Sequence, residues 1–441
     1  MAVRIGRDKF LILGFFTAAI LLGSALLVLP GVYSPGGLGY ADALFTATSA
    51  VCVTGLITVD TAQFSLLGKI IILALIQLGG LGIITFATLF VALPRRKISI
   101  VSHGVISDYT LPEVEYRPKT VLKAIVKYTL IFEALGVVAF ALRFGALGYS
   151  LSDSLLHGVF HSISAFCNAG FSTFSNSLEN FRGDLVINAT AMVLIFSGGI
   201  GFIVIKDVRK FITRQKTHLS FHSKIVLKTS GILIAAGTLA FFLLEYRGSM
   251  DGFSLGEKIL ASLFQAVTPR TAGFDTIPQG SLGAGSRLLT ILLMFIGASP
   301  ASTGGGVKTT VFFVLMMTAF RYHETSDTIC VDGRSLNPRT VEKAVGVAVK
   351  AFGIILLVTV LLAWAESGRG ARFSDILFES VSALGTVGLS TGLTPGLGKL
   401  SKLILVATMF VGRVGLFALA LPKTEKDVDG YALLPKADIM L

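Results

Sequence analysis

Residues 41–57 read ADALFTATSAVCVTGLI, a short apolar stretch that ends at a glycine, and the pattern occurs three more times. The other copies are SDSLLHGVFHSISAFCNAGFS (152–172), GEKILASLFQAVTPRTAGFD (256–275) and SDILFESVSALGTVGLS (374–390). They align without gaps on Gly55, Gly170, Gly273 and Gly388, which are 115, 103 and 115 residues apart. Repetition at this spacing indicates four equivalent structural units in one chain.

The composition indicates that these units lie in a membrane. Hydrophobic residues make up 53% of the 441 residues, charged residues only 15%, and the mean hydropathy is +0.78. The sequence predicts an all-α integral membrane protein with eight transmembrane helices, two in each repeat, because a helix needs roughly 20 apolar residues to cross a bilayer. The eight apolar runs are 10–29, 66–93, 119–142, 185–205, 224–244, 286–296 continuing at 309–320, 343–365 and 400–421.

The formal charge of +12 is concentrated before the first apolar run and between repeats, whereas residues 30–65 contain no Lys or Arg. The positive-inside rule therefore predicts cytoplasmic termini and linkers, with the repeated motifs entering from outside. Such a distribution reflects membrane topology and argues against nucleic-acid binding. The predicted boundaries are 1–94, 95–213, 214–323 and 324–421 for the four repeats, and 422–441 for a cytoplasmic C-terminal tail.

Each repeated motif provides about 12 residues of helix, which is too short to span a bilayer and predicts a re-entrant pore helix. A helix–re-entrant helix–helix unit returns to its starting side, so the four repeats are expected to be parallel around a central pore. Irregular backbone at membrane depth must be buried or line a water-filled path. Four glycine-centred loops could then present carbonyl oxygens to a dehydrated cation. The alternative is that the glycines only form tight packing turns.

The predicted filter takes three residues from each repeat and coordinates the ion through backbone carbonyls. These residues are Val53, Thr54, Gly55, Asn168, Ala169, Gly170, Thr271, Ala272, Gly273, Thr386, Val387 and Gly388.

The second apolar run of repeat three is interrupted at 297–308 by GASPASTGGGVK, whose Pro and consecutive Gly residues cannot continue a helix. We expect an intramembrane loop that obstructs the ion path beneath the glycine ring. A phosphate-binding loop is disfavoured because the spacing fails G-x-x-x-x-G-K-[ST] and no strand precedes it. The predicted gate residues in this loop are Gly297, Ala298, Ser299, Thr303, Gly304, Gly305, Gly306 and Lys308.

Arg413 lies in the apolar stretch 406–419 and is also assigned to the gate. A charge at that depth costs at least about 2.5–3.5 kcal/mol, which favours a functional role. One interpretation is a positive barrier to cations. The other is a salt bridge to Asp207 or Glu133.

The remaining candidates do not indicate an enzyme. Cys52, Cys167 and Cys330 give no disulfide framework. His157 and His161 are four residues apart, but no H-E-x-x-H motif is present and packed core histidines are favoured over a metal site. No catalytic residues are predicted.

Several motifs together resemble those of the Trk/Ktr/HKT superfamily of potassium transporters over nearly the whole chain. They are VTGL (53–56), QLGGLG (77–82), FCNAGFS (166–172), SGGIGF (197–202), TPRTAGF (268–274), MFIGASPASTGGGVK (294–308), GTVGLS (385–390) and MFVGRVG (409–415). Direct entry into repeat one is similar to the Ktr-type membrane subunit. Two positions depart from the expected pattern: the glycine-rich run at 303–306 and Leu416-Phe417.

The resemblance implies four M1–P–M2 repeats with a K⁺ filter, a gating loop at 297–308 and the last-helix arginine at Arg413. It also implies a homodimer in the cell membrane, in contact with membrane lipid. A cytosolic ring of RCK regulatory subunits would bind the nucleotide, with Na⁺ as a candidate activator. Glycine at all four filter positions predicts potassium selectivity, because sodium-favouring relatives often carry serine in place of Gly55. An ion-coupled K⁺/Na⁺ symporter and a sodium-permeable relative are the alternatives.

Overall fold

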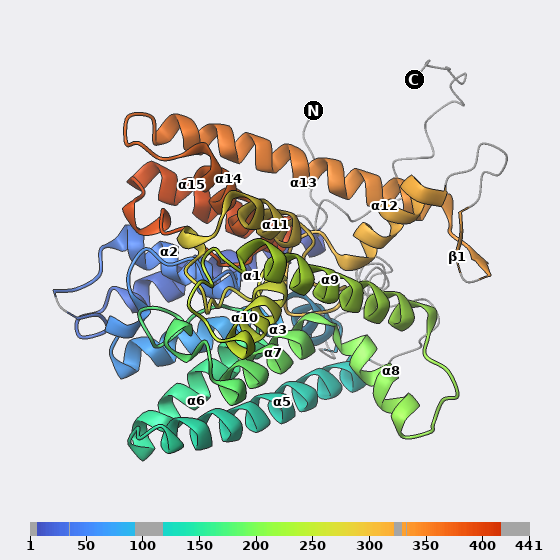
Figure 1. Ribbon diagram of the computed structural model, residues 1–441, viewed down its shortest axis with the longest axis horizontal. Helices are drawn as coiled ribbons and strands as arrows, with labels where there is room; N and C mark the ends of the chain where they lie inside the picture. Colours follow the sequence, from blue (N-terminus) through green and yellow to red (C-terminus); the bar gives the residue numbers. More distant parts are fainter. Residues whose placement is uncertain (1–6, 35, 93–117, 322–328, 332, 416–441) are drawn as a thin grey trace.

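The computed structural model describes residues 7–34, 36–92, 118–321, 329–331 and 333–415 (Figure 1). Nearly all of the regular structure is helical, which confirms the predicted all-α class. The long helices are α1 (Arg7–Leu27), α3 (Leu66–Ala92), α5 (Pro118–Ala146), α9 (Phe221–Glu245) and α13 (Pro338–Ala365). The shorter ones are α2 (Tyr40–Val51), α6 (Leu151–Phe166), α7 (Leu185–Gly199), α8 (Phe202–Ile212), α10 (Leu255–Val267), α11 (Ala284–Phe295), α12 (Thr309–Arg321), α14 (Phe373–Gly385) and α15 (Lys399–Phe410).

Single-turn 3₁₀ helices lie between the motif helices and the helices that follow them: η1 (Thr61–Gln63), η2 (Glu179–Phe181), η3 (Gln279–Ser281) and η4 (Thr394–Gly396). A π-helical turn, η5 (Val411–Gly415), continues α15. The strands β1 (Cys330–Val331) and β2 (Arg334–Ser335) form one small antiparallel hairpin.

The four motif helices lie inside a frame of longer helices. In Figure 1, α13 runs along one edge of the molecule, α5 along the opposite edge, and α9 between them. The motif helix α2 packs against α1 and α3, α6 against α5 and α7, α10 against α9 and α7, and α14 against α13, α11 and α15. A further contact between α15 and α2 joins the last part of the chain to the first.

The count of membrane-spanning helices differs from the eight predicted. Among the described residues, three helices are long and apolar enough to cross a membrane: Leu122–Ala146, Phe221–Glu245 and Pro338–Ala365. A fourth is obtained if Leu185–Gly199 and Phe202–Ile212, bent by 104°, form one broken span. Ile12–Leu27, Leu66–Gly82, Ala284–Phe295 and Thr309–Phe320 are apolar but shorter.

Part of this difference has a physical cause, which is a break at a similar place in each repeat. Gly82 has φ 28° and ψ −141° within α3, and Gly201, with φ 91°, separates α7 from α8. The segment 297–308 separates α11 from α12, as the sequence predicted. In the last repeat the helix changes to π geometry at Val411. Breaks of this kind usually occur at glycines and π-turns, where the regular hydrogen-bond ladder stops.

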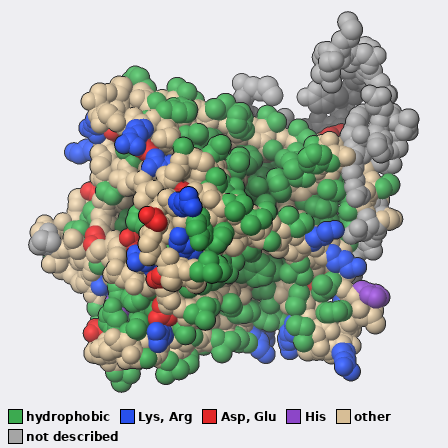
Figure 2. Space-filling view, in the orientation of Figure 1, with side chains coloured by type: hydrophobic (Ala, Val, Ile, Leu, Met, Phe, Trp, Pro, Cys, Tyr) green, Lys and Arg blue, Asp and Glu red, His purple; other side chains and the backbone are tan. Residues whose placement is uncertain are grey.

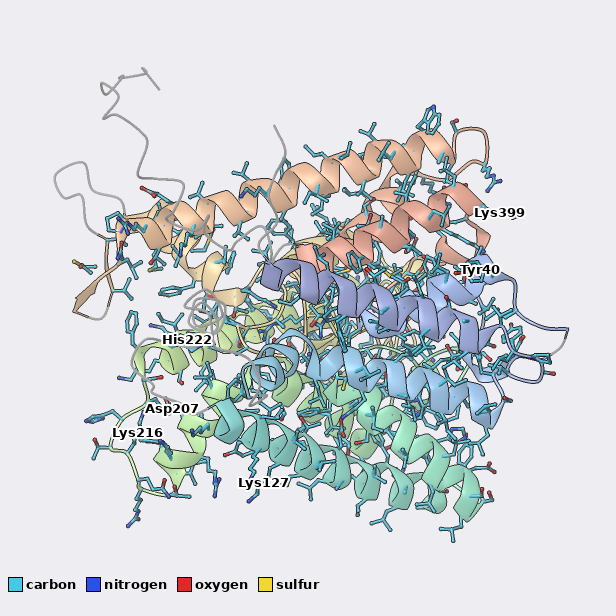
Figure 3. All side chains as sticks on the ribbon, turned by 180° about the vertical axis from the view of Figure 1, so that it is seen from behind. Tyr40, Lys127, Asp207, Lys216, His222 and Lys399 are labelled. Atoms are coloured by element: carbon cyan, nitrogen blue, oxygen red, sulfur yellow. The ribbon has the colours of Figure 1, made fainter. Side chains whose placement is uncertain are left out.

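The motif helices begin at one end of the molecule with an acidic residue in the first turn: Asp42, Asp153, Glu257 and Asp375. An acidic side chain there interacts favourably with the positive end of the helix dipole. Three of these carboxylates also form an ion pair with a basic side chain from another repeat: Asp42 with Lys402 (2.6 Å), Glu257 with Arg182 (3.9 Å) and Asp375 with Arg287 (3.1 Å). Figure 3 shows Tyr40 and Lys399 at this end, and Asp207, Lys216 and His222 at the opposite end.

Burial of the motif helices follows the repeat with one shift in register. Phe45, Phe160 and Phe378 lie ten residues before their glycines and are fully buried. In repeat three the aligned residue, Leu263, is only partly buried, and the fully buried ring belongs to Phe264. Repeat three therefore keeps a large buried ring but moves it by one residue.

Candidate functional site: a ring of four glycine loops

The four motif glycines, far apart in the sequence, lie against one another. A Cβ placed on Gly55 would lie 2.6 Å from the carbonyl oxygen of Ala169, and one on Gly170 would lie 2.9 Å from that of Ala272. Real Cβ atoms do not approach other atoms this closely, so only glycine fits without displacing the backbone.

The same contact continues through the other two repeats and closes the circle. A Cβ on Gly273 would lie 2.5 Å from the oxygen of Val387, and one on Gly388 would overlap that of Thr54. Each glycine therefore packs against the carbonyl of the residue that precedes the next glycine. The order of contacts is repeat one, two, three, four and back to one, and it brings together eight of the twelve predicted filter residues, the glycines and the residue before each.

The residue two positions before each glycine has a left-handed backbone. The φ values are 55° for Val53, 59° for Asn168, 72° for Thr271 and 50° for Thr386. Bulky and β-branched residues rarely adopt this conformation, which costs on the order of 1–3 kcal/mol, and such strain is typical of functional sites. The sequence analysis missed it, since local propensity disfavours Val53, Thr271 and Thr386 at positive φ.

Hydroxyl groups on the motif helices hold the loops in place. The backbone N–H of Gly55 donates to Ser49 Oγ (3.0 Å), and that of Gly388 donates to Ser382 Oγ (3.1 Å). In repeat two, Ser164 Oγ donates instead to the carbonyl of Phe171 (2.8 Å). These serines are each six residues before the motif glycine, so comparing the copies could have revealed them.

In repeat three, Val267 occupies that position, and the adjacent Thr268 donates to the carbonyl of Phe274. A hydroxyl anchor is thus kept in every repeat, although its position shifts by one residue in the third.

Two buried polar residues hold the chain just beyond the ring. Glu379, fully buried in α14, accepts hydrogen bonds from Ser390 Oγ (2.6 Å), the Thr391 N–H (3.1 Å) and Thr394 Oγ1 (2.6 Å). The equivalent residue in α6, His161, has its Nε2 2.9 Å from Ser172 Oγ. Both residues lie nine positions before their glycines, and both serines two positions after. The sequence analysis did not assign Glu379 a role.

The other histidine of the predicted pair also faces a hydroxyl, with His157 Nδ1 2.7 Å from Thr173 Oγ1. Among the described residues, no group of three or more His, Cys, Asp or Glu side chains could hold a metal ion. Cys52 and Cys167 are buried thiols at equivalent positions, and Cys330 is exposed.

An acidic residue lies two positions after Gly273. Burial, with a contribution from the nearby Glu179 carboxylate, raises the pKa of Asp275 to about 7. The Asp275 N–H donates to Ser177 Oγ (3.2 Å) and its carbonyl accepts from the Leu178 N–H (3.0 Å), which links the loops of repeats two and three.

Glycines in the second helices allow close contact with the ends of the motif helices. A Cβ on Gly79 would overlap the carbonyl oxygen of Val51, and one on Gly198 would overlap that of Phe166. Gly412 has the same relation to Leu384. Close backbone approach therefore occurs within residues 77–82 and 197–201, and in repeat four as well.

The interrupted segment 297–308 lies directly against the ring. A Cβ on Gly304 would overlap Thr271 Oγ1, and one on Gly305 would overlap Thr386 Oγ1, so the loop touches two of the left-handed residues predicted to form the filter. Thr303 Oγ1 donates to the Phe166 carbonyl at the end of α6 (3.2 Å).

The same segment is also bonded to the second helices. The N–H groups of Ser299 and Thr303 donate to the carbonyls of Gly199 (2.9 Å) and Gly198 (3.2 Å). Within the loop, the Gly297 N–H donates to the Val307 carbonyl (2.8 Å), which closes its base.

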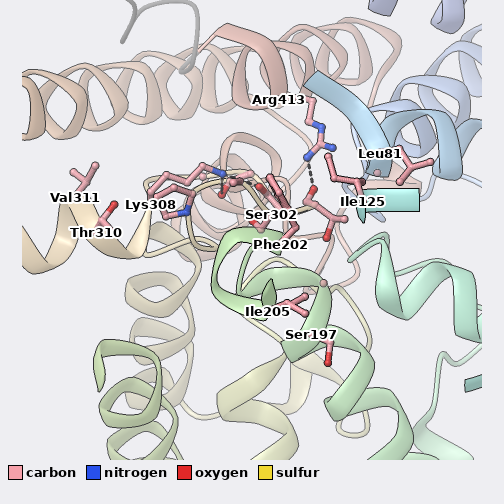
Figure 4. Close-up of a pocket in the computed structure, with 18 of the residues that line it drawn as sticks. Leu81, Ile125, Ser197, Phe202, Ile205, Ser302, Lys308, Thr310, Val311 and Arg413 are labelled. Atoms are coloured by element: carbon pink, nitrogen blue, oxygen red, sulfur yellow. Dashed lines mark hydrogen bonds between the residues drawn. The ribbon is translucent and has the colours of Figure 1, made fainter. Parts of the chain in front are cut away.

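Two cations brace this loop. Lys308 Nζ donates to the Gly304 carbonyl (2.7 Å), and Arg413 donates through Nη1 to the Thr303 carbonyl and through Nη2 to the Gly79 carbonyl. Arg413 thereby connects repeats one, three and four. Figure 4 shows its side chain directed at the loop, with a dashed line marking a hydrogen bond.

The two carboxylates suggested as salt-bridge partners of Arg413 have other partners. Asp207 pairs with Lys216 (2.8 Å), and Glu133 accepts from Gln77 Nε2 (3.3 Å). The hydrogen bonds of Arg413 to carbonyl oxygens favour a role in holding the loop.

A cavity of about 350 Å³ lies beside the loop. Its lining includes Pro300–Gly306 and Arg413, residues of α3 and α5, and Ser197, Phe202 and Ile205 around the α7–α8 break (Figure 4). The cavity and the ring therefore contact the same segment.

Comparison with known proteins identifies the family of this chain. The sequence profile of TrkH, described as cation transport protein, matches residues 7–428. The chain belongs to the TrkH family. It is thus a member of a membrane transport family rather than an enzyme.

The chain is 38% identical to Ktr system potassium uptake protein B of Bacillus subtilis over 96% of its own length and 95% of that protein. It is 32% identical to potassium/sodium uptake protein NtpJ of Enterococcus hirae, over 99% and 98% of the two chains. The crystal structure of the potassium transporter TrkH from Vibrio parahaemolyticus matches with a TM-score of 0.73 and 21% identity, covering 94% of this chain and 84% of that one. At that identity, the structural match shows the shared fold.

The predicted tail 422–441 and the unusual Leu416-Phe417 lie outside the described residues. The glycine-rich run at 303–306, also unusual, lies against the glycine loops of repeats three and four, where the Gly304 and Gly305 positions leave no space for a side chain.

Proposed function

We propose that this chain is the potassium-conducting membrane subunit of a Ktr-type uptake system. The observation that carries the proposal is the closed ring in which each motif glycine packs on the carbonyl preceding the next. Four such loops provide backbone carbonyl oxygens around one axis, which is the chemistry that replaces the hydration shell of K⁺. The C-terminal ends of α2, α6, α10 and α14 approach the same point and add their negative dipoles.

In this proposal the helices form four parallel M1–P–M2 repeats around a central pore, with the boundaries predicted from the sequence. The broken second helices still cross the bilayer, because unwound backbone is tolerated where it is enclosed by protein or lines a water-filled path. The termini and the α8 end are cytoplasmic, and the motif helices begin at the outer face of the cell membrane. K⁺ is the transported ion, held by filter carbonyls, and not a resident cofactor.

We infer that segment 297–308 is the gate. It lies beneath the ring. Arg413 holds it there through carbonyl contacts, and Lys308 stabilises its shape through contacts within the segment. Conduction then requires this loop to move, and the adjacent cavity offers space for that movement. The positive charge of Arg413 would also oppose a cation in the path, so bracing and repulsion act in the same direction.

The assembly proposed is a homodimer in contact with membrane lipid and regulated by a cytosolic RCK ring that carries the nucleotide. The name "Ktr system" of the relatives from Bacillus subtilis and Vibrio alginolyticus supports a multi-subunit assembly. Na⁺ is proposed as an activator.

Potassium-uptake complementation tests the proposal. A bacterium lacking its own potassium uptake systems should grow at low potassium when it expresses this chain with an RCK subunit, and growth should improve with sodium. Failure to grow, with the protein present in the membrane, would contradict the proposed function. Growth that is independent of the RCK subunit would contradict only the regulatory part.

A second candidate is an ion-coupled K⁺/Na⁺ carrier or a sodium-permeable pore, favoured by the similarity to potassium/sodium uptake protein NtpJ. Isotope flux in proteoliposomes separates these mechanisms. A symporter moves Na⁺ with K⁺ in a fixed ratio, whereas a K⁺ pore changes its rate with Na⁺ without moving it.

A further inference from the structure

Helix α8 differs in direction and composition from the membrane helices around it. It follows α7 after a bend of 104° at Ile200-Gly201, where Gly201 has φ 91°. If α7 lies near the membrane normal, a helix bent by this angle lies close to the membrane plane. In Figure 1, α8 stands at the end of the molecule opposite the motif-helix starts.

The helix and the turn after it carry positive charge and exposed apolar side chains together. Five basic residues lie within 202–218, against one carboxylate, Asp207: Lys206, Arg209, Lys210, Arg214 and Lys216. Phe211 and Ile212 at the end of α8 are 45% and 72% exposed. Figure 2 shows Lys and Arg side chains gathered along the edge where α8 lies.

The first turn of α8 is buried in the protein, where Phe202, Ile203 and Val204 are covered. Asp207, in the next turn, is also buried and is held by Lys216 and by the Ser220 N–H (2.7 Å). An amphipathic helix that is basic on its free face, with exposed aromatic and aliphatic residues, is typical of helices that lie in a bilayer interface and contact acidic lipids.

The start of α8 is bonded to segment 297–308. The Phe202 N–H donates to the Ala301 carbonyl (3.0 Å), and a Cβ on Gly201 would overlap the Pro300 carbonyl. Ile205, one turn further, lines the cavity beside the loop. A displacement of α8 would therefore act directly on the loop.

A second contact joins α8 to the same cavity. Arg209 Nη1 donates to Tyr128 Oη on α5 (3.2 Å), and Tyr128 lines the cavity. The exposed part of α8 thus lies at the proposed cytoplasmic surface. Its first turn contacts segment 297–308 through Phe202, and Arg209 contacts the lining of the adjacent cavity.

We propose that α8 binds the headgroups of acidic phospholipids in the cytoplasmic leaflet and that this contact sets the position of segment 297–308. The lipid phosphate pairs with Lys210 and Arg214, while Phe211 and Ile212 enter the interface. A bilayer is favoured over a soluble partner because the apolar and basic groups are adjacent on a helix nearly perpendicular to α7. The effect on the gate rests on the proposed function, whereas the lipid contact does not.

The test uses the full-length chain in vesicles of phosphatidylcholine, alone or mixed with phosphatidylglycerol. A spin label at position 211, introduced as Phe211→Cys in a Cys330→Ser background, reports whether this end of α8 is immersed in the bilayer. We expect the label to be more accessible to lipid-soluble oxygen than to a water-soluble relaxant when phosphatidylglycerol is present. A water-accessible label in both vesicle types would overturn the lipid contact.

Lipid affinity is measured separately, by titrating labelled phosphatidylglycerol into the purified protein. Lys210→Gln/Arg214→Gln should weaken binding by about fivefold for each charge removed. The matched control is Arg247→Gln/Lys399→Gln, which removes two exposed charges at the opposite end. The proposal would be overturned if the two double variants bound phosphatidylglycerol with equal affinity. It would also be overturned if the RCK subunit occupied α8 in the absence of lipid.

Potassium flux then tests the connection to the gate. Wild type and control should respond to phosphatidylglycerol, and Lys210→Gln/Arg214→Gln should lose most of that response. Specific lipid binding with lipid-independent flux would overturn the gating part alone. Lipid binding in a protein that carries no K⁺ under any condition would overturn the proposed function and leave the lipid site supported.

Discussion

Arg413 gives the most discriminating prediction, because it separates bracing of segment 297–308 from electrostatic repulsion. Arg413 bonds to the carbonyls of Thr303 and Gly79, which lie on different repeats. A hydrogen bond from a charged donor contributes about 1.5–3 kcal/mol. Loss of the Thr303 contact, at about 2 kcal/mol, shifts the equilibrium between held and displaced loop by about thirtyfold, since 1.36 kcal/mol corresponds to a factor of ten.

Two substitutions apply this reasoning. Arg413→Met removes both the contacts and the charge, so K⁺ flux in proteoliposomes should rise by about an order of magnitude or more. Arg413→Lys keeps the charge, but a single ammonium group cannot reproduce the forked geometry that reaches two carbonyls. We therefore expect Arg413→Lys to raise flux as well, by a smaller factor.

Arg369→Met serves as the matched control, because Arg369 is an exposed partner of Glu366. It should leave flux unchanged. If Arg413→Lys matches wild type while Arg413→Met increases flux, repulsion alone operates and the bracing argument is wrong. If neither Arg413 variant changes flux and both fold normally, Arg413 has no part in gating.

Two further predictions concern packing and pH. Gly198→Ala places a Cβ on the Phe166 carbonyl, and this overpacking should lower the free energy of unfolding by about 1–3 kcal/mol and so lower Tm. The control is Gly231→Ala, which has no atom within 4 Å and should leave Tm unchanged or slightly raised. Equal Tm values for the two variants would contradict the close contact. The pKa of Asp275 is raised to about 7, so folding favours its protonated form and stability should fall as pH rises from about 4 to 7. Asp275→Asn should make Tm depend less on pH over this range. An unchanged pH dependence of Tm would refute the raised pKa of Asp275.

Much of the site could be predicted from the sequence, because it depends on glycine at repeated positions. The four motif glycines, the break at 297–308 and the packing glycines of the second helices all follow from where a side chain cannot fit or a helix cannot continue. The repeat supplied the evidence that a single copy could not, since only four copies in register indicate a ring.

The rest depends on contacts between distant segments, which local patterns do not reveal. The left-handed conformation of Val53 opposes its own backbone preference and is imposed by the closed ring. Arg413 was expected to act as a barrier or to meet a carboxylate, and the structure shows hydrogen bonds to the backbone carbonyls of Thr303 and Gly79, which have no sequence signature. The sequence predicted a break only in the second span of repeat three, whereas the break at Gly201 also redirects the apolar run 185–205 into α8.

The central claim is that the glycine ring selects potassium, and the K⁺/Na⁺ flux ratio of Gly55→Ser in proteoliposomes tests it most directly. A Cβ at Gly55 lies 2.6 Å from the Ala169 carbonyl, so the substitution must displace a ring oxygen. Gly392→Ser is the control, because Gly392 also has positive φ (95°) but no atom within 4 Å. We predict that Gly55→Ser loses most of the preference for K⁺ while Gly392→Ser keeps it. A Gly55→Ser protein that folds, conducts and discriminates as wild type does would contradict the account.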